Sequence, residues 1–272
     1  MQLTNIAAYV PETELSVLPP DFDALGVGPR QTLSEVESNL LGQRGWIIAS
    51  SKLTKGSGKA ARLARVYLAD ERTITAPTGH GVVPIDGIIV AYEAVGDEAM
   101  AEAPEVRAAI VQRRTFYFDA GEQVAIASLS DALVKKYGPS GNDRPGAGDG
   151  HRDFDRNGVL ITERPGPSFA PCLLDENKRT VDFVQLKWIY DRPWHGSSSE
   201  LWGAGFLGCG AHVEVLIREQ QGTGAVDELK ITLSDRDLVL NAEWAFIEAR
   251  LGPEIRTAAG LANSGGTDAP EL

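Results

Sequence analysis

The sequence predicts an α+β protein, built mainly of antiparallel strands with about four short-to-medium helices and an extended N-terminal arm. Three observations predict this class. Segments in which apolar and polar residues alternate, as they do in strands, outnumber segments with helical spacing. Strand-like and helix-like segments do not alternate regularly, so a parallel sheet built from βαβ units is not expected. Gly, Pro and Asn residues separate most segments and suit short turns.

The N-terminal part of the chain is expected to contain an arm, a helix and several strands. Residues 1–30 start with a short apolar segment and continue through prolines and glycines, which predicts an extended arm. Thr32 and Glu35 have the spacing of a capping box, which predicts a helix over 33–41. Strands are predicted at 46–50, 62–69, 72–76 and 82–95.

Two further helices are predicted in the middle of the chain. Pro104 suits the first turn of a helix, which predicts helical structure over 104–112. Ser128 and Asp131 have the spacing of a second N-terminal cap, for a helix that ends at Gly138. Strands are predicted between these helices at 115–118 and 123–127.

A loop rich in glycine and proline, residues 138–150, is the best candidate boundary between two parts of the chain. It separates a β-rich N-terminal half, residues 1–137, from a C-terminal α+β half, residues 151–256. One continuous domain is the alternative, because 272 residues are long for one domain and short for two.

The second half contains the clearest strand pair of the sequence. Apolar residues alternate with polar ones from Ala211 to Ile217 and again from Leu229 to Leu233. Ser234 then suits the N-cap of a helix over 235–251, which is apolar nearly all round and is expected to be buried between two surfaces. Two earlier strands are predicted at 159–162 and 181–190.

Composition narrows the classes of function. The net charge is 26 − 38 = −12, which opposes non-specific binding to nucleic acid. No apolar run reaches the roughly 20 residues that cross a bilayer, and the N-terminus lacks the basic start of a signal peptide. Two cysteines do not make a disulfide framework. These features predict a protein of the cytoplasm, or of a particle assembled there, without a membrane partner.

The most distinctive electrostatic feature is a basic segment, residues 38–69. It holds six basic residues and no acidic one, so the rest of the chain carries −12 − 6 = −18. Such a segment can bind an acidic protein surface or phosphates, or it can be a solvated hairpin whose lysines discourage strand pairing. The candidate contact residues are Arg44, Trp46, Lys52, Lys55, Lys59, Arg62 and Arg65.

One short motif resembles the start of a calcium loop. Asp153, Asp155 and Asn157, followed by Gly158, supply alternate oxygen ligands and a sharp turn. The glutamate that usually completes the loop is replaced by Arg164. We therefore expect an Asp/Asn/Gly turn and no cofactor, with Ca²⁺ as the alternative.

Other motifs are weaker. A zinc set would combine Cys172, His195, Cys209 and His212, whose spacing fits no established pattern. Residues 55–60 lack the first glycine and the hydroxyl of a phosphate loop. The aromatic residues Trp188, Tyr190, Trp194 and Trp202 could stack a ligand but more often pack a loop onto a core. No motif for nucleophilic catalysis is present.

Three hypotheses about function follow from these features. The first is a non-enzymatic component of a larger assembly, whose partners are copies of itself or other subunits; a viral or phage particle is an example by analogy. In this hypothesis neighbours order the arm, and its removal leaves the remaining fold intact. The second is a single-stranded nucleic-acid-binding protein that uses residues 44–65, with Trp46 stacking on bases. The third is a metal-dependent enzyme with a site near residues 153–157.

Overall fold

A computed structural model shows how the chain folds. It describes residues 15–50, 62–69, 73–75, 82–84, 86–117, 123–140, 150–161, 210–239, 241–242 and 245. All statements below concern these residues. Among them, no helix has both the length and the apolar character needed to cross a membrane.

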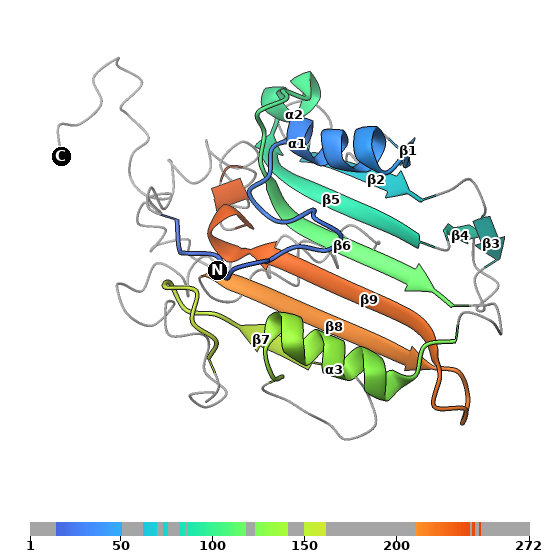
Figure 1. The fold of residues 1–272 in the computed structure, drawn as a ribbon. Coiled ribbons are helices and arrows are strands. Elements are labelled where there is room, and N and C mark those ends of the chain that lie inside the picture. The colour runs from blue at the N-terminus through green and yellow to red at the C-terminus, as the bar shows by residue number, and fades with distance from the viewer. Residues whose placement is uncertain are drawn as a thin grey trace, which may run out of the picture.

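A seven-stranded sheet organises the described residues (Figure 1). Its strand order is β1-β2-β5-β6-β9-β8-β7, and every neighbouring pair is antiparallel. The strands are β1 (Ile47–Ser50), β2 (Arg62–Leu68), β5 (Asp86–Val95), β6 (Ala108–Phe116), β7 (Gly150–Asp153), β8 (Ala211–Glu219) and β9 (Val226–Asp235). A separate two-stranded sheet joins β3 (Thr73–Thr75) to β4 (Val82–Pro84). The predicted class, α+β with mainly antiparallel pairing, is confirmed, with the sheet dominant.

Short helices accompany the sheet. They are α1 (Leu33–Glu37), the π-helix η1 (Ser38–Gln43), α2 (Asp97–Ala101) and α3 (Ile126–Tyr137). The capping box at the start of α1 is confirmed: the Glu35 backbone N–H donates to Thr32 Oγ1 at 3.2 Å, and the Thr32 N–H donates to Glu35 Oε2 at 2.8 Å.

Side chains on the two faces of the sheet form two apolar clusters. We call the face toward the viewer in Figure 1 the front face; α1, η1, α3 and the arm pack on it. Its cluster includes Leu40, Tyr67, Tyr92, Tyr137 and Leu233. The other side is the back face, where the start of a helix after β9 packs against small residues. The back cluster consists of Ala64, Ala91, Ala109, Ile110, Leu238, Val239 and Ala242.

The arm belongs to the core of this chain. Phe22 and Val27 are 7% and 0% exposed, and Phe22 meets the ring of Phe154 edge-on at 5.9 Å between centroids. The Tyr137 hydroxyl donates to the Asp23 carbonyl at 2.6 Å. The hypothesis that the arm needs a neighbour is therefore wrong for residues 15–30, because its own sheet and α3 already hold them. Residues 1–14 lie outside the described range.

Four local predictions are wrong, one of them the cap at Ser128, which lies inside α3 because the N-cap is Ala125. The residues predicted as a helix over 104–112 instead lead into β6, where Ala108 to Val111 are buried between both clusters. A short apolar run buried on both sides suits a central strand as well as a helix, so periodicity could not separate the two. In place of the strand predicted at 123–127, residues 126 and 127 begin α3. In place of the strand predicted at 159–162, Leu160 makes an isolated bridge with Phe154.

The helix after β9 begins one residue later than predicted. Ser234 is still a strand residue, and the cap is Asp235, whose Oδ1 accepts hydrogen bonds from the N–H groups of Asp237 and Leu238 at 3.0 and 3.3 Å. Residues 236–239, 241–242 and 245 are helical. The predicted strand at 181–190 lies outside the described residues.

The predicted halves of the chain share one sheet. β6, from residues 1–137, pairs with β9, from residues 151–256, between Ile110↔Ser234 and Phe116↔Glu228. The pairing lies in the middle of the sheet rather than at an edge.

Candidate functional site

Two of the predicted contact residues in the basic segment point inward. Arg65 donates to Glu37 Oε1 through Nη1 and to Glu102 Oε2 through Nη2, the latter at 2.5 Å, and its side chain is only 10% exposed. Trp46 is 8% exposed and belongs to the front cluster. Neither side chain can reach a nucleic acid unless local packing opens.

The other predicted contact residues are less constrained. Arg44 is exposed and donates to Asn39 Oδ1 at 3.2 Å. The backbone of Arg62 starts β2, but its side chain lies outside the described residues, as do Lys52, Lys55 and Lys59. The structure therefore leaves the binding role of this segment as a prediction, with Arg44 on the surface.

The strand β1 forms one edge of the seven-stranded sheet. Ile47 and Ile48 are 37% and 39% exposed, although successive side chains of a strand point to opposite faces. Neither face of β1 is therefore fully covered. The register shifts between Ile48 and Ser50, so the regular part of this edge is short.

A buried polar cluster connects β7, β8 and the helix after β9. His212 Nδ1 lies 2.8 Å from Asp153 Oδ1, and Arg236 Nη2 donates to the same oxygen at 2.7 Å. A carboxylate only accepts hydrogen bonds, so we assign the imidazole proton of His212 to Nδ1. Arg236 Nη2 also lies 2.9 Å from this Nδ1; because both atoms then carry protons, this is a close contact and not a hydrogen bond. The ring of His151 stacks on His212 at 5.6 Å between centroids.

Electrostatics keep this cluster in a defined protonation state. Burial, followed by the charge of Arg236, lowers the pKa of His212 to about 4. Burial alone would raise the pKa of Asp153. Hydrogen bonds from His212 and Arg236, together with the charge of Arg236, instead lower this pKa well below its usual value. The cluster thus holds a neutral imidazole between a carboxylate and a guanidinium at neutral pH.

This arrangement resembles the base and orienting pair of a hydrolase only in part. The register places Asp153, His212 and Ser234 side by side on three adjacent strands. Ser234 Oγ, however, is buried and has no hydrogen-bond partner in the described part of the chain, so it is not bonded to the imidazole. A nucleophile needs that hydrogen bond and access to substrate. The cluster therefore ties β7 to the rest of the sheet.

The residues of the motif that resembles a calcium loop do not converge. Asp155 Oδ1 accepts hydrogen bonds from the N–H groups of Asn157 and Val159 at 2.8 and 2.9 Å, which makes a local turn, and Gly158 has a φ of +73°. Asp153 instead faces His212. Within the described ranges no three His, Cys, Asp or Glu side chains are grouped as they would be around a metal ion.

The remaining motif residues are mostly not described. Of the zinc set, His212 is bonded to Asp153, while Cys172, His195 and Cys209 lie outside the described residues. The four aromatic residues between 188 and 202 lie outside them too.

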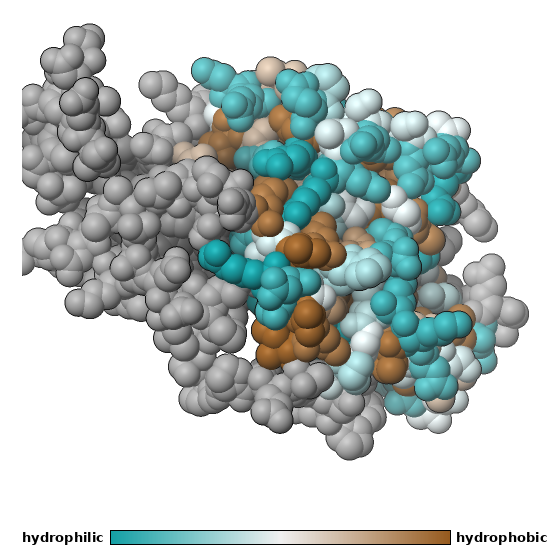
Figure 2. All heavy atoms as spheres, turned by 60° about the vertical axis from the view of Figure 1, so that its left-hand side comes forward, coloured by the Kyte–Doolittle hydropathy of each residue, from teal (hydrophilic) through white to brown (hydrophobic). Residues whose placement is uncertain are grey.

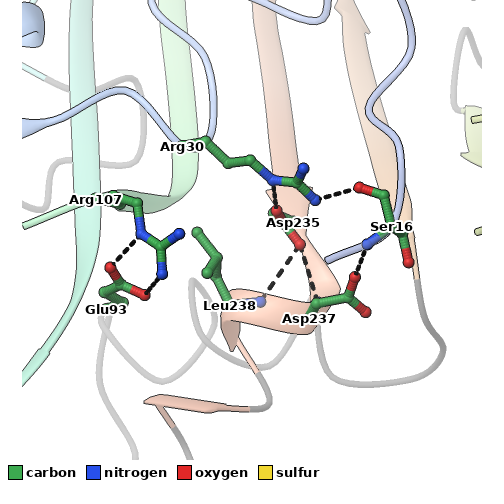
Figure 3. Close-up of polar contacts among 7 residues, drawn as sticks. All are labelled: Ser16, Arg30, Glu93, Arg107, Asp235, Asp237 and Leu238. Carbon is green, nitrogen blue, oxygen red and sulfur yellow. Dashed lines mark hydrogen bonds and ion pairs between the residues drawn. The ribbon is translucent and has the colours of Figure 1, made fainter. Parts of the chain in front are cut away.

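A second polar cluster attaches the arm at the end of β9 (Figure 3). Arg30 Nε donates to Asp235 Oδ2 and Nη2 donates to the Ser16 carbonyl at 2.5 Å, while the Ser16 N–H donates to Asp237 Oδ2 at 2.6 Å. Asp235 is fully buried, and burial raises its pKa. Nearby, Arg107 makes two hydrogen bonds to Glu93, at 2.6 and 2.9 Å. The cluster holds the arm against its own sheet.

Sequence reasoning expected Asp153 in a turn, with calcium as the alternative, and considered His212 for a weak zinc set; it missed their pairing and Arg236. The pattern Ser-Asp-Arg-Asp at residues 234–237 was a usable signal, because it places charged side chains where a strand ends and a helix begins.

The chain matches no model of a known protein family, no curated protein and no solved structure. The geometry of the molecule itself is thus the basis for any function assigned to it.

Proposed function

We propose that the chain is a non-enzymatic subunit of an assembly of its own copies, and that β1 with the surrounding basic segment contacts an acidic surface of a neighbour. The observation that supports this function is the position of β1 at an edge of the sheet that the described residues form, where Ile47 and Ile48 are both more than a third exposed. An uncovered strand edge has backbone groups that can pair with another chain.

Charge favours an acidic neighbour. The basic segment carries six positive charges in a chain whose remainder carries −18. Arg65 is already paired with Glu37 and Glu102, which leaves five charges in the segment. Because every other copy is strongly acidic outside this segment, the copies of the chain are themselves suitable partners.

The short β1 edge limits the form of the contact. The strand has four residues, its register shifts after Ile48, and Lys52 follows two residues beyond its end. These features protect an edge from indiscriminate pairing. The contact is therefore a small apolar one, made by two isoleucines and guided by charge, rather than a long continuous sheet.

The two alternative functions need side chains that the fold has committed elsewhere. Binding of single-stranded nucleic acid would use Trp46 and Arg65, which are buried and paired. A metal-dependent enzyme near residues 153–157 would require Asp153 to leave His212 and Arg236.

The test is the mass of the native protein, measured by light scattering over a range of concentrations and salt. The wild-type chain should exceed the monomer mass of 29.2 kDa. The double change Ile47→Ser with Ile48→Ser should shift the protein toward the monomer. Reversal of Lys52, Lys55 and Lys59 to glutamate should do the same by removing the charge attraction.

A matched control is Val134→Ser, because Val134 is 45% exposed on α3, away from β1. It should leave the mass unchanged. A wild-type chain that stays monomeric at every concentration contradicts the proposal. Micromolar, salt-dependent binding of a single-stranded oligonucleotide by that monomer would support the nucleic-acid alternative instead.

A further inference from the structure

Three cationic side chains gather on the back face of the sheet, at the end where β6 and β8 finish and β9 begins. Arg114 on β6 lies opposite Lys230 on β9, and Arg218 on β8 lies opposite Glu228 on β9. Alternation along the strands places all four on the same face. We call Arg114, Lys230 and Arg218 the cationic patch.

One buried carboxylate pairs with both arginines of the patch. Glu228 is 1% exposed; Arg114 Nε donates to its Oε1 at 2.5 Å, and Arg218 Nη1 lies 3.0 Å from its Oε2 as an ion pair. The side chain of Lys230 makes no ion pair or hydrogen bond with any described residue, Glu214 on the next cross-strand pair included. The patch therefore has three positive charges on the same face as one negative charge.

The patch is accessible. The side chains of Arg114 and Arg218 are 41% and 49% exposed, and Arg114 also lies over the ring of Phe116, 4.7 Å from its centroid. This cation–π contact and the bond to Glu228 hold the guanidinium in place while part of it faces solvent. An anionic group from outside can reach both arginines.

The fold itself does not need this concentration of charge. Arg114 and Lys230 lie opposite each other on neighbouring strands. Like charges in such a position destabilise a sheet. The chain has twelve more acidic than basic residues, yet among the described residues only Glu228 pairs with the patch. A local excess of two positive charges that the sheet does not balance favours an external carboxylate partner.

A complementary surface lies at the other end of the sheet. Around α2, Asp97, Glu98 and Glu105 are exposed and make no ion pair with described residues, whereas Glu102 pairs with Arg65. We call Asp97, Glu98 and Glu105 the acidic patch. In Figure 2, hydrophilic side chains make up much of the upper part of the described surface, the height at which Figure 1 places α2.

The two patches of one chain cannot meet. α2 lies before the start of β6, and six residue-to-residue steps of extended strand, about 20 Å, lead from Ala108 to Arg114. Figure 1 shows α2 at the top and the end of β6 at the lower right. Complementary patches at opposite ends of one subunit can instead join successive copies head to tail.

We infer that the cationic patch of one copy binds the acidic patch of a second copy. The inference rests on the proposed function, since it requires that copies associate, and it adds a contact distinct from β1. Because the two patches differ, the contact is heterologous and builds a ring or an open chain of subunits rather than a closed pair.

The experiment exchanges the charges. Variant A carries Arg218→Glu and Lys230→Glu, so that both of its patches are acidic. Variant B carries Asp97→Lys and Glu98→Lys, so that both of its patches are basic. Each variant alone should lose the higher mass of the wild type, whereas an equimolar mixture should recover it, because A then alternates with B through two attractive contacts. Salt should weaken the recovered assembly.

The control variant carries Asp131→Lys and Lys135→Glu, two exposed residues of α3, and should keep the wild-type mass. Circular dichroism checks that A and B are folded. If variant A does not fold, Arg218→Gln with Lys230→Gln replaces it and should lower the mass without reversing the charge.

The outcomes separate this contact from the proposed function. Variants A and B that each assemble like the wild type overturn the patch contact and leave β1 assembly standing. A mixture of folded A and B that keeps the lower mass of the separate variants also overturns it. A monomeric wild-type chain overturns both. Restored mass in the mixture alone supports the inference.

Discussion

His212 is a buried histidine beside the charged side chains of Asp153 and Arg236. Its protonation should change the free energy of unfolding of the protein. Its imidazole donates to Asp153 and lies beside Arg236, so a second proton would place two cations in contact. Burial and Arg236 lower its pKa to about 4, against 6.5 for an unperturbed histidine.

The pH dependence follows from that difference. Between pH 6.5 and about 4 the unfolded chain binds a proton at His212 that the folded chain does not, so the free energy of unfolding should fall as the pH is lowered through this range. We expect a loss of about 1–3 kcal/mol by pH 4, measured by urea denaturation. His212→Gln should remove most of that slope. An NMR titration of His212 with a midpoint near 6.5 would contradict the prediction.

The arm is the element whose role changed most between sequence and structure. Prolines and glycines predict an extended segment correctly, but the side chains between them enter the front cluster. Arg30 and Ser16 attach both ends of the described arm to Asp235 and Asp237 (Figure 3). An arm held in this way stabilises its own subunit.

Removal of the arm should therefore unfold the protein. Phe22→Ala alone should cost about 3–5 kcal/mol, as truncations of buried aromatic side chains do. Deletion of residues 1–30 removes Phe22, Val27 and Arg30 together and should abolish cooperative melting. Deletion of residues 1–14 is the control, because it removes none of the described contacts. A chain that lacks residues 1–30 and still melts cooperatively would restore the view that neighbours order the arm.

At the scale of the whole molecule, the pairing of β6 with β9 joins the two parts that the glycine-rich loop seemed to separate. The pairs run from Ile110↔Ser234 to Phe116↔Glu228, in the middle of the sheet. Separation of the halves would turn two central strands into long edges without partners.

Neither half should fold alone. Fragments 1–137 and 151–256, produced separately, should lack a cooperative thermal transition and tend to aggregate, because each exposes an unpaired central strand. Coexpression should recover a complex that melts cooperatively. Circular dichroism measures both results. A fragment that melts cooperatively on its own would establish two domains with a boundary near residues 138–150.

The sequence by itself determined the elements whose signal is local. The capping box at Thr32 and Glu35 predicts α1, since its partners are three residues apart. Strict alternation predicts β8 and β9, because one buried face imposes a period of two. The Asp155 turn also follows from neighbours in the chain.

Only the tertiary structure decided whether a segment whose pattern suits both a helix and a buried strand forms one or the other. Ala108 to Val111 suit a helix or a buried strand, and the choice of β6 depends on β5 and β9 on either side. Arg65, Arg114 and Lys230 are all basic residues at strand positions, and the sequence does not show which are neutralised. Glu37 and Glu102 meet Arg65, whereas no carboxylate of the described chain meets Lys230. Charge pairing depends on residues far apart in the chain, so the fold decides which charges remain for a partner.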